Sequence, residues 1–154
     1  MLEARRLLLA SHGTPGARAA DRLALELCPR GGTLWHLVVV PDFWRGMMGD
    51  DWLNNAATRE VYGRHVESQL AGEIDRHRRA VAGECSARGI VYEAKTVLGK
   101  PDRCLVEYAA AVAPRLVVMG SPRPRGAPGL RSRMNTETLV RELTVPLLIA
   151  PHPR

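Results

Sequence analysis

The stretch GSPRPRGAPGLRSRMN at residues 120–135 combines residue types that bind phosphate groups. Glycine lets a backbone approach a ligand closely, and arginine holds phosphate oxygens through its planar fork. The loop contains three glycines and four arginines, namely Gly120, Gly126, Gly129, Arg123, Arg125, Arg131 and Arg133. Composition alone leaves two interpretations open: a cradle for a phosphate-bearing ligand, or a solvated basic surface loop.

A second stretch with suitable chemistry is SHGTPG at residues 11–16. The imidazole of His12 titrates near pH 6.5 in its ordinary state, so it could contact a ligand or transfer a proton. A loop histidine more commonly caps the local backbone, and that interpretation stays open. Three named motifs are absent from the chain. GTPG supplies only GxxG of the dinucleotide-binding pattern GxGxxG, and the P-loop is excluded because Gly99-Lys100 is followed by proline and lacks the upstream glycine. The nucleophile elbow GxSxG is also absent.

Hydrophobic patterning indicates the elements that must position these two stretches. Short apolar runs predict buried strands at residues 5–11, 33–41, 90–99, 115–121 and 145–151. Apolar residues at helical spacing predict helices at 17–28, 61–85, 101–113 and 135–143, the second of them with an apolar stripe that includes His65 and His77. Strands that alternate with helices predict an α/β fold: one domain over residues 1–154 with a mostly parallel sheet and helices on both faces.

The expected sheet also predicts where a ligand would bind. In open parallel sheets ligands lie beyond the carboxyl ends of strands, where the strand order reverses. The stretch 11–16 follows the first strand and the loop 120–135 follows the fourth, so the two meet if those strands are neighbours. The helix after the second loop would point its N-terminus at the same crevice.

Bulk composition limits the class of protein. The chain has 154 residues and a formal net charge of +6. Its three cysteines are widely spaced and form no CxxC pair, which is typical of a reduced, cytoplasmic protein. The first apolar run is too short for a signal peptide and no stretch is long enough to span a bilayer, so no membrane association is expected. Nucleic acid is not an expected partner, since no aromatic platform accompanies the arginines.

The segment Phe43–Trp52 is apolar and irregular, with Trp44, Met47, Met48 and Trp52. It is interpreted either as a lid over the crevice or as a surface for a protein partner. Asp50 and Asp51 could form a metal site with His65, but adjacent aspartates usually point apart, and no metal site is predicted.

Taken together, these segments resemble the universal stress protein family over nearly the whole chain. The opening unit of that family is similar to RLLLASHGTPGARAADRLALELC. Its third and fourth strands, with the Gly-x-Pro helix start between them, are similar to VLGKPDRCLVEYAAAVAPRLVVMGS. Its last helix and strand are similar to LVRELTVPLLIAP. The resemblance implies a five-stranded parallel sheet of order 3-2-1-4-5, of the adenine-nucleotide alpha-hydrolase-like kind. It also implies homodimers paired through the last strand, here Val145–Ala150.

Some members of the family bind ATP through Gly-x-x-Gly-x(9)-Gly-Ser/Thr after strand four. On this chain Gly120 matches the first glycine, Arg123 and Arg133 stand at the second and third, and Met134 at the Ser/Thr position. The acidic residue that ATP-binding members carry at the end of strand one is His12 here. An arginine fills the space that a glycine leaves for a phosphate, so the resemblance leaves a side-chain cradle of arginines in place of a backbone one.

The sequence therefore predicts a dimeric binding or regulatory protein, not an enzyme, whose ligand is ATP, AMP or another phosphate-bearing anion. The residues expected to bind that ligand are Ala10, Ser11, His12, Gly13, Thr14, Val39, Met119, Gly120, Arg123, Gly126, Gly129, Arg133, Met134 and Asn135. Two alternatives remain: slow nucleotide hydrolysis with His12 as the base, and a scaffold without a small-molecule ligand. No catalytic residue is predicted.

Overall fold

Strands and helices alternate along the described part of the chain. The computed structural model describes residues 4–11, 15–40, 56–98, 100–121 and 135–151. In chain order the elements are β1 (Arg6–Ala10), α1 (Pro15–Leu27), β2 (Thr33–Val40), α4 (Ala56–Arg88), β3 (Val91–Leu98), α5 (Pro101–Val112), β4 (Leu116–Gly120), α6 (Thr136–Glu142) and β5 (Leu147–Ala150). The elements predicted from the sequence are thus present, with ends that differ by a few residues.

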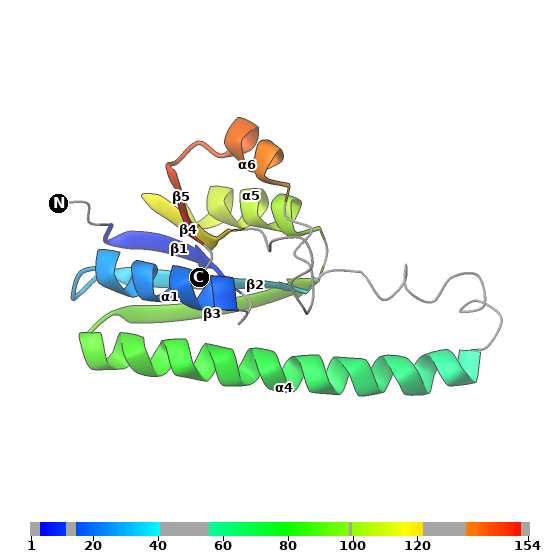
Figure 1. The fold of residues 1–154 in the computed structure, drawn as a ribbon. Helices are drawn as coiled ribbons and strands as arrows, with labels where there is room; N and C mark the ends of the chain where they lie inside the picture. The colour runs from blue at the N-terminus through cyan, green and yellow to red at the C-terminus, as the bar shows by residue number, and fades with distance from the viewer. Residues whose placement is uncertain (1–3, 12–14, 41–55, 99, 122–134, 152–154) are drawn as a thin grey trace.

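The strands form one parallel sheet of order β3-β2-β1-β4-β5 (Figure 1). In the register of the central strand, Leu7 lies opposite Leu34 on one side and Leu116 on the other. The predicted fold class and strand order are confirmed. The order reverses between β1 and β4, so their carboxyl ends form a topological switch point.

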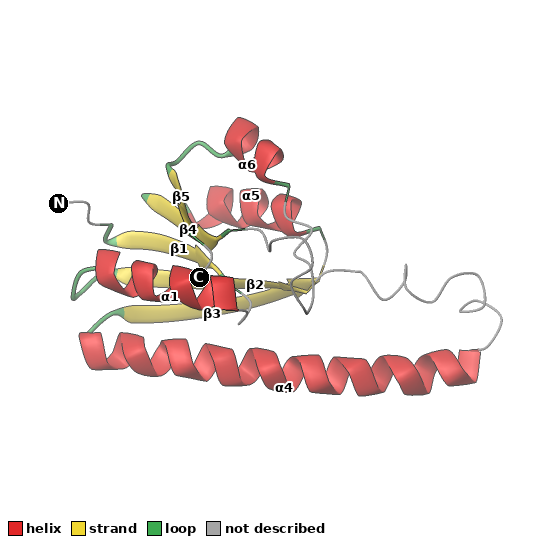
Figure 2. Ribbon diagram, in the orientation of Figure 1, coloured by secondary structure: helices red, strands yellow, loops and turns green. Residues whose placement is uncertain are grey.

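Helices cover both faces of the sheet, with α1 and α4 on one face and α5 and α6 on the other (Figure 2). Residues of β1 alternate between the two layers, because successive side chains of a strand point to opposite faces. Leu7 and Leu9 pack in the α1/α4 layer, and Leu8 packs in the α5/α6 layer. All three are fully buried, which explains why β1 is apolar from Leu7 onward.

The helix ends follow from local sequence. Pro101 occupies the first turn of α5, where its missing N–H costs nothing, and Asp102 complements the helix dipole there. At the other end of α5, the guanidinium of Arg6 donates hydrogen bonds to the carbonyls of Val112 and Ala113. These contacts tie the end of α5 to the start of β1.

Among the described residues, no helix has both the length and the apolar character that a bilayer crossing requires.

Candidate functional site

The predicted crevice begins where β1 and β4 end side by side. Ala10 lies opposite Met119 of β4 and opposite Leu37 of β2. Ala10, Val39 and Met119 all pack in the α5/α6 layer, so the structure brings these three predicted residues together on one face. Gly120 follows Met119 as the last residue of β4. Met119 is buried and Ala10 and Val39 are partly buried, so the three side chains form an apolar layer at the switch point.

Ser11, also predicted to bind the ligand, turns its hydroxyl to the opposite face of the sheet. Its Oγ lies 3.2 Å from Nε2 of His77 and 3.5 Å from the carbonyl of Ala17. Its backbone N–H donates to the carbonyl of Leu37 at 3.3 Å. The side chain of Ser11 is thus engaged in the α1/α4 layer.

Asn135 caps the last helix. Its side-chain oxygen accepts a hydrogen bond of 3.3 Å from the backbone N–H of Thr138, and α6 is only seven residues long. A ligand contact from Asn135 would therefore compete with capping.

The remaining predicted ligand residues lie outside the described residues, and so does the segment Phe43–Trp52. These predicted residues are His12, Gly13, Thr14, Arg123, Gly126, Gly129, Arg133 and Met134.

Ser121, which the sequence did not single out, follows Gly120 at the same end of the sheet. Its backbone N–H donates to the carbonyl of Ala150 at 2.9 Å, but its buried Oγ has no hydrogen-bond partner among the described residues. A buried hydroxyl without a partner calls for an explanation. Its position beyond β4 makes it a candidate polar contact for a ligand in the crevice.

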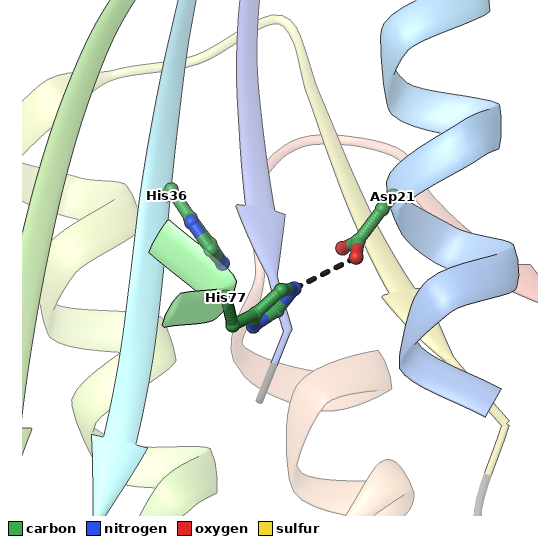
Figure 3. Close-up of side chains that lie close together, drawn as sticks. All are labelled: Asp21, His36 and His77. Carbon is green, nitrogen blue, oxygen red and sulfur yellow. Dashed lines mark hydrogen bonds and ion pairs between the residues drawn. The ribbon is translucent and has the colours of Figure 1, made fainter. Parts of the chain in front are cut away.

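A cluster of polar side chains lies in the other layer, under α1 and α4. Oδ2 of Asp21 lies 2.7 Å from Nε2 of His77, with side chains that are 11% and 10% exposed (Figure 3). Asp21 comes from the inner face of α1 and His77 from the inner face of α4. The helical periodicity that buries Ala20 and Ala24 also places Asp21 near the sheet.

His36 of β2 completes this cluster and is fully buried. Its ring meets that of His77 edge to face, with centroids 4.9 Å apart. Nε2 of His36 lies 3.2 Å from the carbonyl oxygen of Ser11, and Nδ1 lies 2.6 Å from the hydroxyl of Tyr92. Since a carbonyl only accepts, Nε2 carries the ring proton and donates it to Ser11.

The environment keeps His36 neutral. Burial, reinforced by the neighbouring ring of His77, lowers the pKa of His36 to about 4. In the neutral ring with its proton on Nε2, Nδ1 is an acceptor, so the hydroxyl of Tyr92 donates to it. Burial also raises the pKa of Tyr92 to about 12, which keeps that hydroxyl protonated.

The arrangement of Ser11, His77 and Asp21 is not a nucleophilic triad. In a triad, one ring nitrogen faces the serine and the other faces the carboxylate. Here Nε2 of His77 faces both groups, while Nδ1 is buried without a partner among the described residues. The cluster thus lacks the relay geometry that would activate the hydroxyl of Ser11.

The sequence contained a signal for this cluster. His77 belongs to the apolar stripe predicted for its helix, and His36, which was not singled out, interrupts a strand predicted to be buried. A buried polar side chain needs a partner. Periodicity did not indicate which residue of α1 would supply it.

A groove of about 940 Å³ between α1 and α4 leads to the cluster. Asp21 and His77 line it, together with charged residues of both signs that include Arg18, Arg22, Glu26 and Arg76.

Comparison with known proteins places the chain in context. The model of the universal stress protein family matches residues 3–151. A comparison with curated protein sequences gave no match.

Several solved structures share the fold at low sequence identity. The hypothetical protein MJ0577 is 16% identical, with a TM-score of 0.74 over 97% of this chain and 98% of that one. A universal stress protein family protein from Arabidopsis thaliana, solved with AMP bound, is 15% identical, with a TM-score of 0.64 over 96% and 92% of the two chains. A universal stress protein in complex with cAMP is 17% identical, with a TM-score of 0.54 over 98% and 100%.

Proposed function

The chain belongs to the universal stress protein family, and on this premise we propose that it is a regulatory protein that binds an adenine nucleotide where β1 and β4 end. The observation that carries the proposal is the parallel pairing of these strands, in which Ala10 lies opposite Met119. It forms the switch point at which open α/β sheets bind ligands. Two proteins of similar fold were solved with AMP and with cAMP.

The described residues suit the base of such a ligand. Ala10, Val39 and Met119 offer apolar contact on one face of the sheet. Ser121 adds a buried hydroxyl that has no partner among the described residues. An apolar surface with a few well-placed polar groups is the usual character of a small-molecule site.

The phosphates are assigned to the loop arginines, and this part of the proposal rests on the sequence. Arg123 and Arg133 replace two glycines of the ATP-binding pattern, and Arg125 stands between them. Each guanidinium can bind phosphate oxygens with two parallel hydrogen bonds. The cradle would then be made of side chains instead of backbone N–H groups.

Calorimetric titration with ATP, AMP, cAMP and adenosine tests the proposal. Saturable binding of at least one nucleotide is expected, and Ser121→Ala should weaken it about 5- to 10-fold, the effect of one lost hydrogen bond. Ser86→Ala, an exposed serine near the far end of α4, is the matched control and should bind as the unmodified protein does. The double variant Arg123→Ala/Arg133→Ala should weaken ATP more than adenosine. No heat with any of the four ligands at millimolar concentration would refute the proposal.

Mass spectrometry of small molecules released from the purified protein identifies the bound nucleotide directly. An adenine nucleotide at a stoichiometric level is the expected result.

We also propose that two copies pair through Val145–Ala150. β5 is an edge strand, and its Ile149 is 36% exposed. The opposite edge, β3, carries Glu93 and Lys95, which discourage edge-to-edge pairing. Light scattering after gel filtration should report a dimer that Ile149→Lys dissociates. Val91→Lys, which places the same charge on the β3 edge, should leave the dimer intact.

Finally, we propose that the protein acts in the cytoplasm. Cys28, Cys85 and Cys104 are all free thiols, as a reducing compartment maintains them.

A further inference from the structure

We propose that Asp21, His36 and His77 bind a divalent transition-metal ion of the zinc type, in the α1/α4 layer of the protein. The three side chains converge from α1, β2 and α4 (Figure 3). One potential ligand atom from each lies within 4.8 Å of the others. This site lies across the sheet from Ala10, Val39 and Met119, so it is separate from the proposed nucleotide crevice.

An unpartnered polar atom in the cluster supports a bound cation. Oδ1 of Asp21 is buried and has no hydrogen-bond partner among the described residues. Nδ1 of His77 also has none, but Nε2 is the atom of His77 that faces Asp21 and Ser11 and is the ligand atom proposed here. The Asp21 side chain is only 11% exposed, so water does not solvate its carboxylate freely. A buried carboxylate that uses one oxygen and leaves the other idle is costly, and a cation bound to that carboxylate would remove the cost.

The donor set favours a borderline cation. Two imidazole nitrogens and one carboxylate oxygen suit Zn²⁺ and its neighbours, whereas Mg²⁺ and Ca²⁺ prefer oxygen ligands alone. Zinc binds four ligands in a tetrahedron, so one position remains for water or a hydroxyl. Ser11 is placed for that position, since its Oγ lies 3.2 Å from Nε2 of His77.

Side-chain shifts would complete the geometry, and His36 must turn Nε2 away from the Ser11 carbonyl that it now faces at 3.2 Å. Bonds of about 2.0–2.1 Å to zinc place neighbouring ligand atoms about 3.3 Å apart. The contact between Asp21 and His77, now 2.7 Å, must therefore lengthen by about 0.6 Å. The two ligand atoms that lie farthest apart, within 4.8 Å of each other, must approach by up to about 1.5 Å. His77 has room for this movement because it lines the groove between α1 and α4.

The hydrogen bonds of His36 can adapt to a metal ion. A ligating Nε2 must give up its proton, which then resides on Nδ1 of the same ring. Nδ1 lies 2.6 Å from the hydroxyl of Tyr92, whose oxygen can accept a hydrogen bond from Nδ1–H in place of donating one to Nδ1. Tyr92 thereby becomes the outer partner that metal-bound histidines usually have. The ring keeps one proton throughout, so the rearrangement changes no net charge.

Titration of chelator-treated protein with Zn²⁺ tests the proposal, with Co²⁺ absorption as a report of coordination geometry. One ion per chain is expected, with the visible bands of four-coordinate cobalt. Tyr92→Phe should weaken zinc binding about 10- to 100-fold, the usual effect of losing an outer partner. Asp21→Asn and His77→Gln each remove a ligand and should weaken it further.

Controls separate this site from other zinc-binding groups. Cys104→Ser removes a thiol of α5, outside the cluster, and should bind zinc as the unmodified protein does. Circular dichroism establishes that each variant is folded, and Tyr92→Phe keeps the test valid if a ligand variant fails to fold. Absence of saturable binding would overturn the proposal, and so would equal affinity in Asp21→Asn, Tyr92→Phe and the unmodified protein.

Discussion

The buried pair of Asp21 and His77, which joins α1 to α4, should be strongly coupled, in contrast to an exposed pair within α4. Asp21 and His77 are 2.7 Å apart with side chains that are 11% and 10% exposed. Asp75 and Arg79 are 3.0 Å apart, but their side chains are 55% and 80% exposed. A hydrogen bond to a charged group contributes about 1.5–3 kcal/mol, whereas an exposed pair at this spacing contributes about 0.3–0.5 kcal/mol.

Two double-mutant cycles measure this difference. Each uses alanine variants of both partners and the double variant, with free energies of unfolding from urea titrations in the presence of a chelator, so that no bound cation contributes. We expect a coupling energy of about 2 kcal/mol for the buried pair and below about 0.5 kcal/mol for the exposed one. Equal coupling energies in the two cycles would refute the conclusion that burial strengthens the contact between Asp21 and His77.

Three further predictions concern the thiols, the turns and the helix caps. Burial raises the pKa of Cys85 to about 11 from an ordinary value of 9.0. Because the folded protein favours the neutral thiol, its contribution to the free energy of unfolding is complete below pH 9 and is lost between pH 9 and 11. The free energy of unfolding should fall by about 2 kcal/mol by pH 10.5. Between pH 7.5 and 10.5, urea titrations should show a smaller fall in the free energy of unfolding for Cys85→Ala than for the unmodified protein. An equal fall in the two proteins would contradict this assignment. Gly32→Ala should destabilise the protein by about 1–3 kcal/mol, because the new methyl group would lie 2.9 Å from Sγ of Cys28 and 3.0 Å from two carbonyl oxygens. Gly83→Ala, in α4 with no atom within 4 Å, should instead stabilise it by about 0.5–1 kcal/mol; thermal melts of the two variants that shift in the same direction would disprove the steric argument. Asn135→Ala should cost about 1 kcal/mol by removing the cap of α6, and Asn135→Ser should restore most of it; equal unfolding free energies for the two variants would show that capping contributes nothing.

The sequence predicted most of the fold because the physical signals for it are local. The runs that became β1 and β4 are apolar except for the exposed Arg6 at the start of β1, as central parallel strands must be when both faces are covered. Pro101 and Asp102 indicated the start of α5 in the same way. The strand order came from resemblance to a family, since local patterns do not determine which strands are neighbours.

The polar cluster could not be predicted to the same extent. Periodicity placed His77 on the buried stripe of α4, but the rotation of that helix relative to α1 decides which residue meets it. The register between β1 and β2 then decides that His36 lies beside the carbonyl of Ser11. Both relations arise from packing between elements distant in the chain, and no spacing within one segment encodes them.

The central position of β1 has a consequence for how the chain assembles during synthesis. Leu7 emerges early but pairs with Leu116, which is made much later, after most of the other elements. Until then one edge of β1 has no neighbouring strand, and such a strand edge invites aggregation. The finished sheet encloses β1 on every side, so the segment most exposed to misassembly in the nascent chain becomes the best protected one in the mature protein.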